Sequence, residues 1–395
     1  MMIYSDSTVN FPEMESAHYS GAVPRRPFTL VRAQGARMWT DDGREFIDCA
    51  AAHGWANVGH SHPAVTAAIQ QQAATFVATH EGAFNDQRAQ WMAELAAALP
   101  GDLSRIQPAN SGAEAVEAAL KAARFFTGRT EIIAAKRGFH GRTFGALSAT
   151  WQKKYRAPFE PLVPDFRHVA FNDLDAMDAA ISDKTAAVIL EVVQGEGGVY
   201  PGDADYFAGV RRLCDQRGAL LIFDEIQTGM GRTGKLFAAE HLPILPDMMT
   251  LGKGLGGGIP MGAAVWRDSL GKLDAGIHGS TFAGNPLACA ASRAVLRVMR
   301  DEQLPERAAR LGDWLMAELR AIDAPQIREV RGLGLMVGVQ LRGRVTPVLK
   351  ALAEEGIWAL PAGPTVLRLL PPLVISEEDL QTVVAKVAYC VKRIA

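Results

Sequence analysis

Short runs of apolar residues, separated by helical segments, constrain the fold of this chain most strongly. Three such runs cover residues 131–135, 186–193 and 219–223. A strand that is apolar along its whole length has to be covered on both faces, as in a parallel sheet between two layers of helices. Helical patterns at 174–181 and 206–217 lie between the runs. This alternation predicts an α/β core with a mostly parallel sheet flanked by helices.

Further periodic segments divide the chain into three parts. We expect helices at 63–77, 89–99, 115–126, 287–300, 306–322 and 377–394, and strands at 328–341 and 366–370. The residues up to about Asp41 are rich in turn residues, which predicts an arm or a short sheet. We therefore predict an N-terminal segment 1–50 that belongs to the small domain, a large domain 51–295 and a smaller α/β C-terminal domain 296–395.

The composition argues against several classes of protein. The chain carries 41 Lys and Arg against 43 Asp and Glu, so its net charge of −2 offers no attraction for nucleic acid or an anionic membrane. No apolar run approaches the roughly 18 residues of a membrane span. The polar residues 1–11 contain no secretion signal. We expect a cytoplasmic protein that binds neither nucleic acid nor membrane.

The cysteines and histidines predict no metal site. The cysteines lie far apart and form no C-x-x-C pair, at positions Cys49, Cys214, Cys289 and Cys390. His60 and His62 form an H-x-H pair, but no third ligand with suitable spacing is visible. We therefore favour structural roles for both histidines.

Two glycine loops match nucleotide-binding motifs in their letters only. Residues 229–235 nearly fit the Walker A pattern, but Leu236 stands where that motif needs a Ser or Thr for magnesium. Residues 252–258 fit G-x-G-x-x-G, yet the chain continues through Pro260 instead of a helix, and Asp274 ends no strand. A nicotinamide-dependent oxidoreductase is kept only as an alternative.

An acid and a lysine carry the strongest chemical signal. Asp224 follows directly on the buried run 219–223, and ligands of open α/β sheets bind at the carboxyl ends of the strands. Lys253 stands among glycines, where the backbone can approach a flat ligand and a desolvated amine can act as a nucleophile. A lone Asp would more often be a solvated loop acid, but the two residues together favour a catalytic site.

Two further motifs complete a pocket for a phosphorylated aromatic cofactor. Ser111 and Gly112 open a helix whose free N–H groups can bind a phosphate, and residues 139–142 place an aromatic ring and basic groups beside a glycine. Each motif alone would more often be an ordinary cap or loop. Together with Asp224 and Lys253, they indicate pyridoxal 5′-phosphate, an electron sink held by a lysine with an acid at its ring nitrogen.

The chain resembles the class III (ω-) aminotransferases, which are fold-type I pyridoxal-phosphate enzymes. The resemblance runs nearly end to end and is carried by motifs at residues 57–63, 139–143, 194–198, 224–229, 251–258, 281–286 and 330–336. Within that class the chain is most similar to the acetylornithine aminotransferases. Residues 150–155 and 362–366 suggest the branch that acts on lysine linked to an amino-group carrier protein.

The resemblance implies roles for the residues around the cofactor ring. Lys253 would hold the cofactor covalently and move the proton during the reaction. Asp224 would pair with the ring nitrogen, and Gln227 would reach the ring hydroxyl. Phe139 would stack on the ring, with His140 beside it.

The phosphate site is implied by the same resemblance. Ser111, Gly112 and Ala113 would bind the phosphate, although the family usually has Thr where this chain has Ala113. Thr281 would reach the phosphate of the neighbouring subunit, so the site would require a homodimer.

Two arginines are candidates for binding substrates with one and two carboxylates in one site, because a guanidinium pairs a carboxylate bidentately. By resemblance, Arg368 would bind the α-carboxylate of glutamate or 2-oxoglutarate, and Arg142 the other carboxylate or that of the donor. Glu196 would neutralise Arg368 when the donor binds, because a buried arginine without a partner is costly. His53 is a possible specificity contact.

The reaction implied is transfer of the terminal amino group of N-acetylornithine or an N-blocked lysine to 2-oxoglutarate. The blocked lysine would be acetyl-lysine or a lysine on an acidic carrier protein. The alternatives are a class III enzyme acting on ornithine, 4-aminobutyrate or succinyldiaminopimelate, a class III aminomutase, and a non-catalytic binding module.

Overall fold

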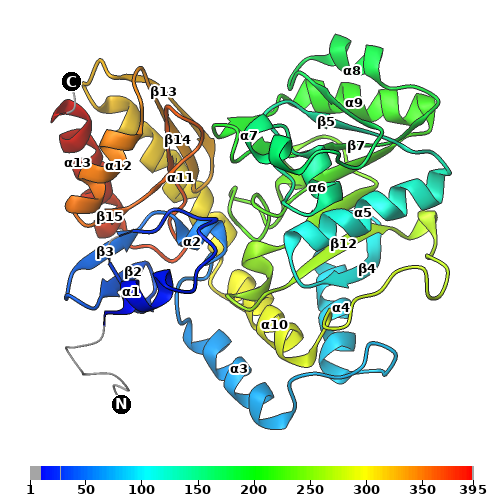
Figure 1. Cartoon of the computed structure of the whole chain (residues 1–395), viewed down its shortest axis with the longest axis horizontal. Coiled ribbons are helices and arrows are strands. Elements are labelled where there is room, and N and C mark those ends of the chain that lie inside the picture. Colours follow the sequence, from blue (N-terminus) through cyan, green and yellow to red (C-terminus); the bar gives the residue numbers. More distant parts are fainter. Residues whose placement is uncertain (1–9, 27, 394–395) are drawn as a thin grey trace.

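The computed structural model describes residues 10–26 and 28–393, which form a larger and a smaller lobe (Figure 1). A seven-stranded sheet runs through the larger lobe. The order of its strands is β4 (Leu103–Ala109), β12 (Gly262–Arg267), β11 (Met248–Leu251), β10 (Leu220–Asp224), β7 (Thr185–Leu190), β5 (Glu131–Ala135) and β6 (Phe166–Val169). The strands from β11 to β6 are parallel, whereas β12 is antiparallel to both of its neighbours.

Helices cover both faces of this sheet. Those that pack on its strands are α4 (Asp86–Ala98), α5 (Gly112–Thr127), α6 (Phe144–Ala149), α8 (Leu174–Ala180) and α9 (Ala204–Arg217). The lobe also contains α3 (Pro63–Thr75) and α10 (Pro286–Asp301), which pack on each other, and α7 (Lys153–Arg156), which contacts α6. Neighbouring strand residues pack into separate clusters, with Ile132 on the face of α5 and Ile133 on the opposite face with α9. Because both faces are covered, every residue of β7 is buried.

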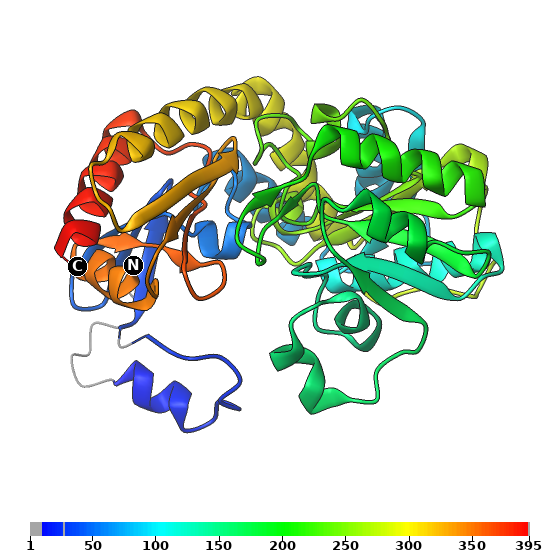
Figure 2. The same ribbon diagram turned by 90° about the horizontal axis from the view of Figure 1, so that it is seen from above.

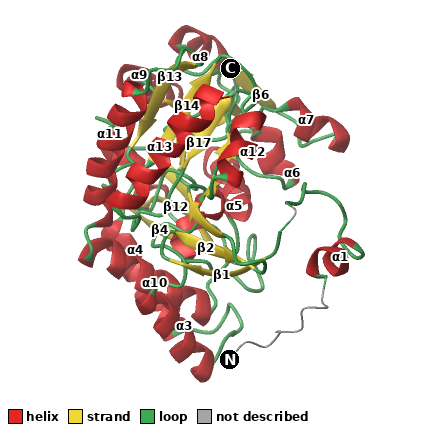
Figure 3. Ribbon diagram, turned by 90° about the vertical axis from the view of Figure 1, so that its left-hand side faces the viewer, coloured by secondary structure: helices red, strands yellow, loops and turns green. Residues whose placement is uncertain are grey.

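The smaller lobe combines the C-terminal part of the chain with its N-terminal strands. Its C-terminal elements are α11 (Leu304–Ala321), β13 (Ile327–Leu333), β14 (Met336–Leu341), α12 (Thr346–Glu354), β15 (Ile357–Trp358), β16 (Leu360–Pro361), β17 (Val366–Leu369) and α13 (Glu377–Arg393). One sheet has the order β13-β14-β17-β16, and α11 packs on β13 and β14 (Figure 3).

The N-terminal strands form a second sheet with a strand from the C-terminal part. Its members are β1 (Leu30–Gln34), β2 (Arg37–Thr40), β3 (Glu45–Asp48) and β15, which runs parallel to β3. The remaining elements are α1 (Phe11–Ser16), α2 (Ala51–Gly54) and the two-stranded ribbon of β8 (Val193–Gln194) and β9 (Tyr200–Pro201). Figure 2 shows that α1 and the segment containing α7 project on the same side of the molecule.

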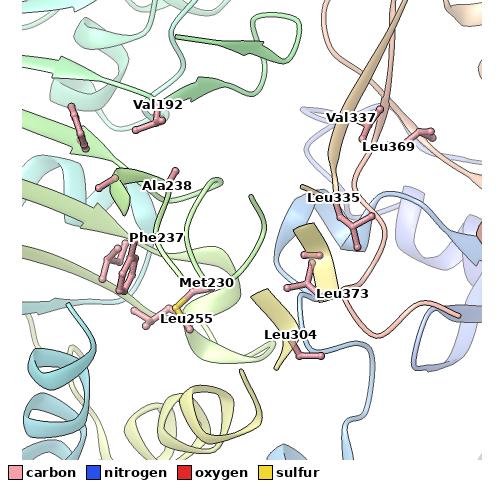
Figure 4. Close-up of a cluster of buried hydrophobic side chains, with 14 of the residues drawn as sticks. Val192, Met230, Phe237, Ala238, Leu255, Leu304, Leu335, Val337, Leu369 and Leu373 are labelled. Atoms are coloured by element: carbon pink, nitrogen blue, oxygen red, sulfur yellow. The ribbon is translucent and has the colours of Figure 1, made fainter. Parts of the chain in front are cut away.

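A buried junction joins the two lobes. Apolar side chains from both lobes meet there, among them Met230 and Leu255 from the larger lobe and Leu335 and Leu373 from the smaller (Figure 4). Arg232 is fully buried beside them and donates hydrogen bonds to the carbonyl of Leu335 at 3.0 Å, the carbonyl of Pro371 at 2.5 Å and Oδ1 of Asn57 at 2.8 Å. The glycine loop 229–235 thus joins the lobes.

The α/β fold with a mostly parallel sheet, predicted from the apolar runs, is confirmed. The prediction of one strand over 328–341 is wrong, because the chain turns at Gly334, where φ is +55°, and forms the hairpin of β13 and β14. Strands β4, β6, β11 and β12 of the large sheet were not predicted, and the expected N-terminal arm contains α1 as well as a sheet. The domain limits at 50 and 295 stay a prediction.

The cysteines and the possible membrane spans were also considered in the sequence. All four cysteines are buried and unpaired. None of the helices in the described part of the chain combines the length and apolarity needed to cross a membrane. Residue 394, at the end of the helix predicted over 377–394, lies outside the described residues.

Candidate active site

The carboxyl ends of neighbouring strands bring the predicted site residues together. Phe223 in β10 pairs with Leu190 in β7, so the next residues, Asp224 at the end of β10 and Glu191 just after β7, lie side by side. β5 lies on the other side of β7, and the loop after it carries Phe139 and His140. Because these strands are parallel, their carboxyl ends face the same side of the sheet, where α/β proteins bind ligands.

A cavity of about 270 Å³ opens at this edge. Nine of the residues predicted for the site line this cavity, and the whole lining consists of Gly112, Ala113, Phe139, His140, Gly141, Arg142, Glu191, Glu196, Asp224, Ile226, Gln227 and Lys253. The loops after four different strands therefore contribute to one concave site, together with the N-terminus of α5.

Lys253 lies in a tight turn that follows β11. The turn Lys253–Gly256 is a 3₁₀ helix, and Lys253 has a φ of +45°, a left-handed conformation that is unfavourable for a residue with a side chain. A side chain on Gly252 would lie 3.1 Å from the Cα of Gly112, so glycine at both positions lets this turn approach the start of α5. Burial lowers the pKa of Lys253, although the charge of Glu196 opposes this.

Asp224 is buried in a network of hydrogen bonds. Its Oδ2 lies 2.7 Å from Nδ1 of His140, and its Oδ1 accepts from the hydroxyl of Thr250 and the N–H of Ile226, both at 3.1 Å. Burial alone would lower the pKa of His140, but the hydrogen bond and charge of Asp224 outweigh it and raise the pKa. A protonated His140 would stabilise the negative charge of Asp224.

The structure leaves hydrogen-bonding capacity at the cavity. Within the described part of the chain, Nε2 of His140 and Nε of Arg368 are buried and have no hydrogen-bond partner. The first N–H groups of α5 point away from the helix, as they do at every helix start, and lie beside Gly112 and Ala113. Asp224, Lys253, the Phe139 ring and this helix start provide the acid, amine, aromatic and anion-binding groups that pyridoxal phosphate needs, so the residues fit the cofactor.

Arg368 in β17 forms the second charged group of the site. It is almost fully buried, and its Nη1 lies 2.6 Å from Oε1 of Glu196 and donates to Oε1 of Gln227 at 3.3 Å. Burial would raise the pKa of Glu196, but the charges of Arg368 and Lys253 outweigh it and lower the pKa. Glu196 and Arg368 therefore form an ion pair next to Lys253.

Arg142 lies at the exposed end of the cavity. Its guanidinium stacks over the ring of Tyr155 at 3.8 Å from the centroid, and Phe139 lies at 5.5 Å. This cation–π contact holds an exposed arginine in one orientation. His53 has a left-handed φ of +68°, and burial lowers its pKa while the charges of Glu196 and Arg368 act on it in opposite directions.

The family model named "Aminotransferase class-III" matches residues 19–391. The chain belongs to the class-III aminotransferases. This excludes the nicotinamide oxidoreductase and the non-catalytic binding module, and it confirms that the protein is a transaminase of a pyridoxal-phosphate family.

Relatives of known name agree with this assignment. A [LysW]-aminoadipate semialdehyde transaminase of Deinococcus radiodurans is 48% identical over 377 residues, 94% of this chain and 87% of that relative. An acetylornithine aminotransferase of Methanopyrus kandleri is 45% identical over 95% of this chain and 97% of its own. The solved ornithine aminotransferase of Toxoplasma gondii superposes with a TM-score of 0.91 at 34% identity, covering 96% of this chain and 93% of the other.

Four predicted residues of this class-III aminotransferase do not line the cavity that contains Lys253: Ser111, Thr281, Arg368 and His53. Thr281 is exposed and lines a separate hollow of about 810 Å³. The hydroxyl of Ser111 accepts from the N–H of Glu114 at 3.2 Å and so caps α5. Arg368 pairs with Glu196, which lines the cavity, and His53 is influenced by the charges of Glu196, Arg368 and Lys253, whereas the other predicted residues line the cavity themselves.

The two histidines of the H-x-H pair, His60 and His62, have different partners. His60 lies 2.7 Å from Asp48, and His62 lies 3.0 Å from Glu302. Within the described residues, no group of three or more His, Cys, Asp and Glu side chains is placed to hold a metal ion.

Sequence analysis missed two residues of the site. Glu191 follows β7 directly, but the predicted apolar run 186–193 extends past it, so the rule that identified Asp224 did not point to Glu191. Tyr155 gave no signal, because its contact with Arg142 depends on where the loop containing α7 folds back.

Proposed function

We propose that this class-III aminotransferase transfers the terminal amino group of an N-blocked lysine or ornithine to 2-oxoglutarate, giving a semialdehyde and glutamate. The observation that carries the proposal is the ion pair of the buried Arg368 with Glu196 beside Lys253. A site that must accept glutamate in one half-reaction and a donor without a carboxylate at that position in the other needs an arginine that can be neutralised.

Four groups in the cavity would hold the cofactor. The start of α5 at Gly112 and Ala113 would bind the phosphate, Phe139 would face the ring, and Asp224 would hold a proton on the ring nitrogen. When bound, pyridoxal phosphate withdraws electrons from the substrate carbon that carries the amino group.

Lys253 would hold the cofactor through Nζ and move the proton of the reaction. Burial lowers its pKa, so the amine can lose its proton more readily than an exposed lysine and can then accept a proton from the substrate carbon. Asp224 and His140 would keep opposite charges next to each other, which stabilises Asp224 in its charged form.

Glu196 would select between substrates. With the amino donor bound, Glu196 would remain paired with Arg368. With glutamate or 2-oxoglutarate bound, the α-carboxylate would replace Glu196 on the guanidinium, and the other carboxylate would bind Arg142. Both arginines would then be paired in each half-reaction.

A homodimer would complete the site. Thr281 lies outside the cavity of its own chain, in a large hollow lined by residues 78–82 and 276–282 except Ile277. Phe282 and Ile277 are exposed large apolar side chains beside Thr281. Burying them against a second copy would be favourable and would allow Thr281 to reach the partner's phosphate site.

The surface around Arg142 favours an acidic carrier protein as the bearer of the donor lysine. Between Glu131 and Glu160 the sequence contains no acid but six cations, Lys136, Arg137, Arg142, Lys153, Lys154 and Arg156, which we call the cationic rim. Arg142 belongs both to the rim and to the cavity, and Lys154 stacks on the same Tyr155 ring at 4.6 Å. The rim therefore leads from solvent to the active site, and an acidic partner would be attracted to it.

Kinetics with three donors test the proposal: N-acetylornithine, N-acetyl-lysine and lysine linked to an acidic carrier protein. We expect Lys153→Glu with Lys154→Glu to lower kcat/KM for the carrier-linked donor about tenfold and to leave the acetylated donors within about twofold. Arg212→Glu with Lys350→Glu, two exposed cations on α9 and α12, is the matched control.

The outcomes separate the donors. Equal effects of both double variants would contradict docking at the cationic rim. A wild-type preference for N-acetylornithine over the carrier-linked lysine would identify the free acetylated amino acid as the donor. Failure of all three donors, with 2-oxoglutarate present, would contradict the proposed function.

A further inference from the structure

Glu191 is a buried carboxylate at the cavity to which the proposed function gives no role. It follows β7 directly, next to Asp224 on the neighbouring strand, and is 6% exposed. Its side chain lines the same cavity as Lys253. A buried carboxylate without a cationic partner is costly, so its presence at this position calls for a reason.

The two oxygens of Glu191 bind the backbone of two different loops. Oε1 accepts a hydrogen bond from the N–H of Phe139 at 2.9 Å, in the loop after β5. Oε2 accepts from the N–H of Gly195 at 3.0 Å, in the segment after β7. One carboxylate therefore joins the residue whose ring faces the cavity to the residue that precedes Glu196.

Only a carboxylate satisfies both contacts. A glutamine of the same shape has one oxygen and one NH₂ group, so one of the two backbone N–H groups would face a second donor. Hydrogen bonds to a charged acceptor are also stronger than those to a neutral amide. The position thus selects for glutamate in spite of the cost of burial.

The charge of Glu191 also acts on its neighbours. Burial raises its pKa to about 7, and the charge of His140 opposes this rise. Conversely, Glu191 and Asp224 both favour the protonated form of His140. Glu191 therefore favours the charged form of His140, while the charges of Glu191 and Asp224 repel each other.

We propose that Glu191 is a positioning residue that couples two parts of the site: it fixes the Phe139 ring that would face the cofactor, and it fixes the segment from which Glu196 pairs with Arg368. Cofactor affinity and substrate selection should then depend on one side chain. The second half rests on the proposed function, whereas the first needs only the cofactor.

The test is Glu191→Gln, with two readouts. The first is the dissociation constant of pyridoxal phosphate, measured by titrating the apoprotein and following the absorbance of the cofactor. The second is the ratio of kcat/KM for glutamate to that for the amino donor. We expect the dissociation constant to rise about tenfold and the ratio to change by about threefold or more, because a charged hydrogen bond is lost on each loop.

Glu225→Gln is the matched control. Glu225 is also buried at the end of β10, burial also raises its pKa to about 7, and it also binds a backbone N–H, that of Ala239 at 2.7 Å. It does not line the cavity of Lys253. We expect this variant to lower the unfolding temperature without changing either readout by more than about twofold.

Three results would overturn the inference. Glu191 would be purely structural if Glu191→Gln changed only the unfolding temperature, as the control does. A change in only one readout would contradict the coupling. If Glu191→Gln does not fold, Glu191→Asp takes its place, because it keeps the charge but is too short to reach both loops. The third contradicting result would be that Glu191→Asp fails to show the same two changes. Should wild-type protein transfer no amino group, the proposed function fails, and the cofactor titration still decides the role of Glu191 toward Phe139.

Discussion

The buried cluster behind the cavity and the cationic rim in front of it are built in opposite ways. In the cluster, Asp224, Glu191 and His140 are all less than about a tenth exposed, and hydrogen bonds connect each of them to the ends of strands or the loops that follow. In the rim, the cations are mostly exposed and lie on a loop and a one-turn helix. Tyr155 is the main contact that orders Arg142 there.

This difference separates the chemistry from the choice of substrate. Buried groups on strand ends keep fixed positions, because moving one of them would leave charges without partners. Exposed cations can change with little cost to stability. We infer that the cluster serves the reaction shared by the class and that the rim adapts the site to its donor.

Loss of the amine should have the largest effect. We expect Lys253→Ala to lower turnover by a factor on the order of 10⁴, because the residue would both hold the cofactor and move the proton. Lys235→Ala, an exposed lysine in the other glycine loop, is the control and should retain normal turnover. Steady-state kinetics on folded protein measure this, and substantial turnover by Lys253→Ala would place the catalytic amine elsewhere.

Removal of the charge of Asp224 should have the next largest effect. Asp224→Asn keeps the shape of the side chain but cannot hold a proton on the ring nitrogen or balance a protonated His140. We expect turnover to fall by a factor of about 10²–10³ with an unchanged circular dichroism spectrum. Near wild-type turnover by this variant, or by Asp224→Ala, would show that the assignment of the acid is wrong.

The effect of Glu196 should be moderate and should concern selectivity. Glu196→Ala leaves Arg368 free for a carboxylate, so the ratio of kcat/KM for glutamate to that for the amino donor should rise about tenfold. Glu329→Ala, which removes an exposed partner of Arg331, is the control and should leave the ratio unchanged. An unchanged ratio in Glu196→Ala would contradict the proposed selection.

The smallest effect should come from Tyr155, whose ring contacts Arg142 of the cationic rim. Tyr155→Ala removes the ring that contacts Arg142. We expect this loss to weaken binding of the substrate carboxylate by Arg142 by about 0.5–1 kcal/mol, which corresponds to about a two- to fivefold rise in the KM of that substrate. Tyr155→Phe keeps the ring and should behave like wild type. The comparison of KM with kcat for both variants tests this, and a fall in kcat at constant KM would assign Tyr155 to the cluster instead.

The sequence predicted the cluster far better than the rim, and the reason is physical. Asp224 could be found because a buried strand is recognisable as an apolar run and ligands bind where such a strand ends, and Lys253 could be found because it stands among glycines. Glu191 was missed because the predicted run 186–193 extends past Leu190, the last residue of β7. Strand β4 escaped prediction because it contains Arg105 and Gln107 and reads as a polar segment.

The contacts of the rim could not be predicted in this way. Tyr155 meets Arg142 only because the chain folds back after α6, and no local pattern encodes that contact. The position of Thr281 outside the cavity also depends on tertiary structure. Its assignment to a partner's site stays a prediction.

The central claim is that Nζ of Lys253 carries the cofactor. Reduction of the holoenzyme with borohydride, followed by proteolysis and mass spectrometry, tests it directly. We expect one modified peptide, with the reduced pyridoxyl group on Lys253. Modification of another lysine, or recovery of the Lys253 peptide unmodified from a fully loaded protein, would contradict the account.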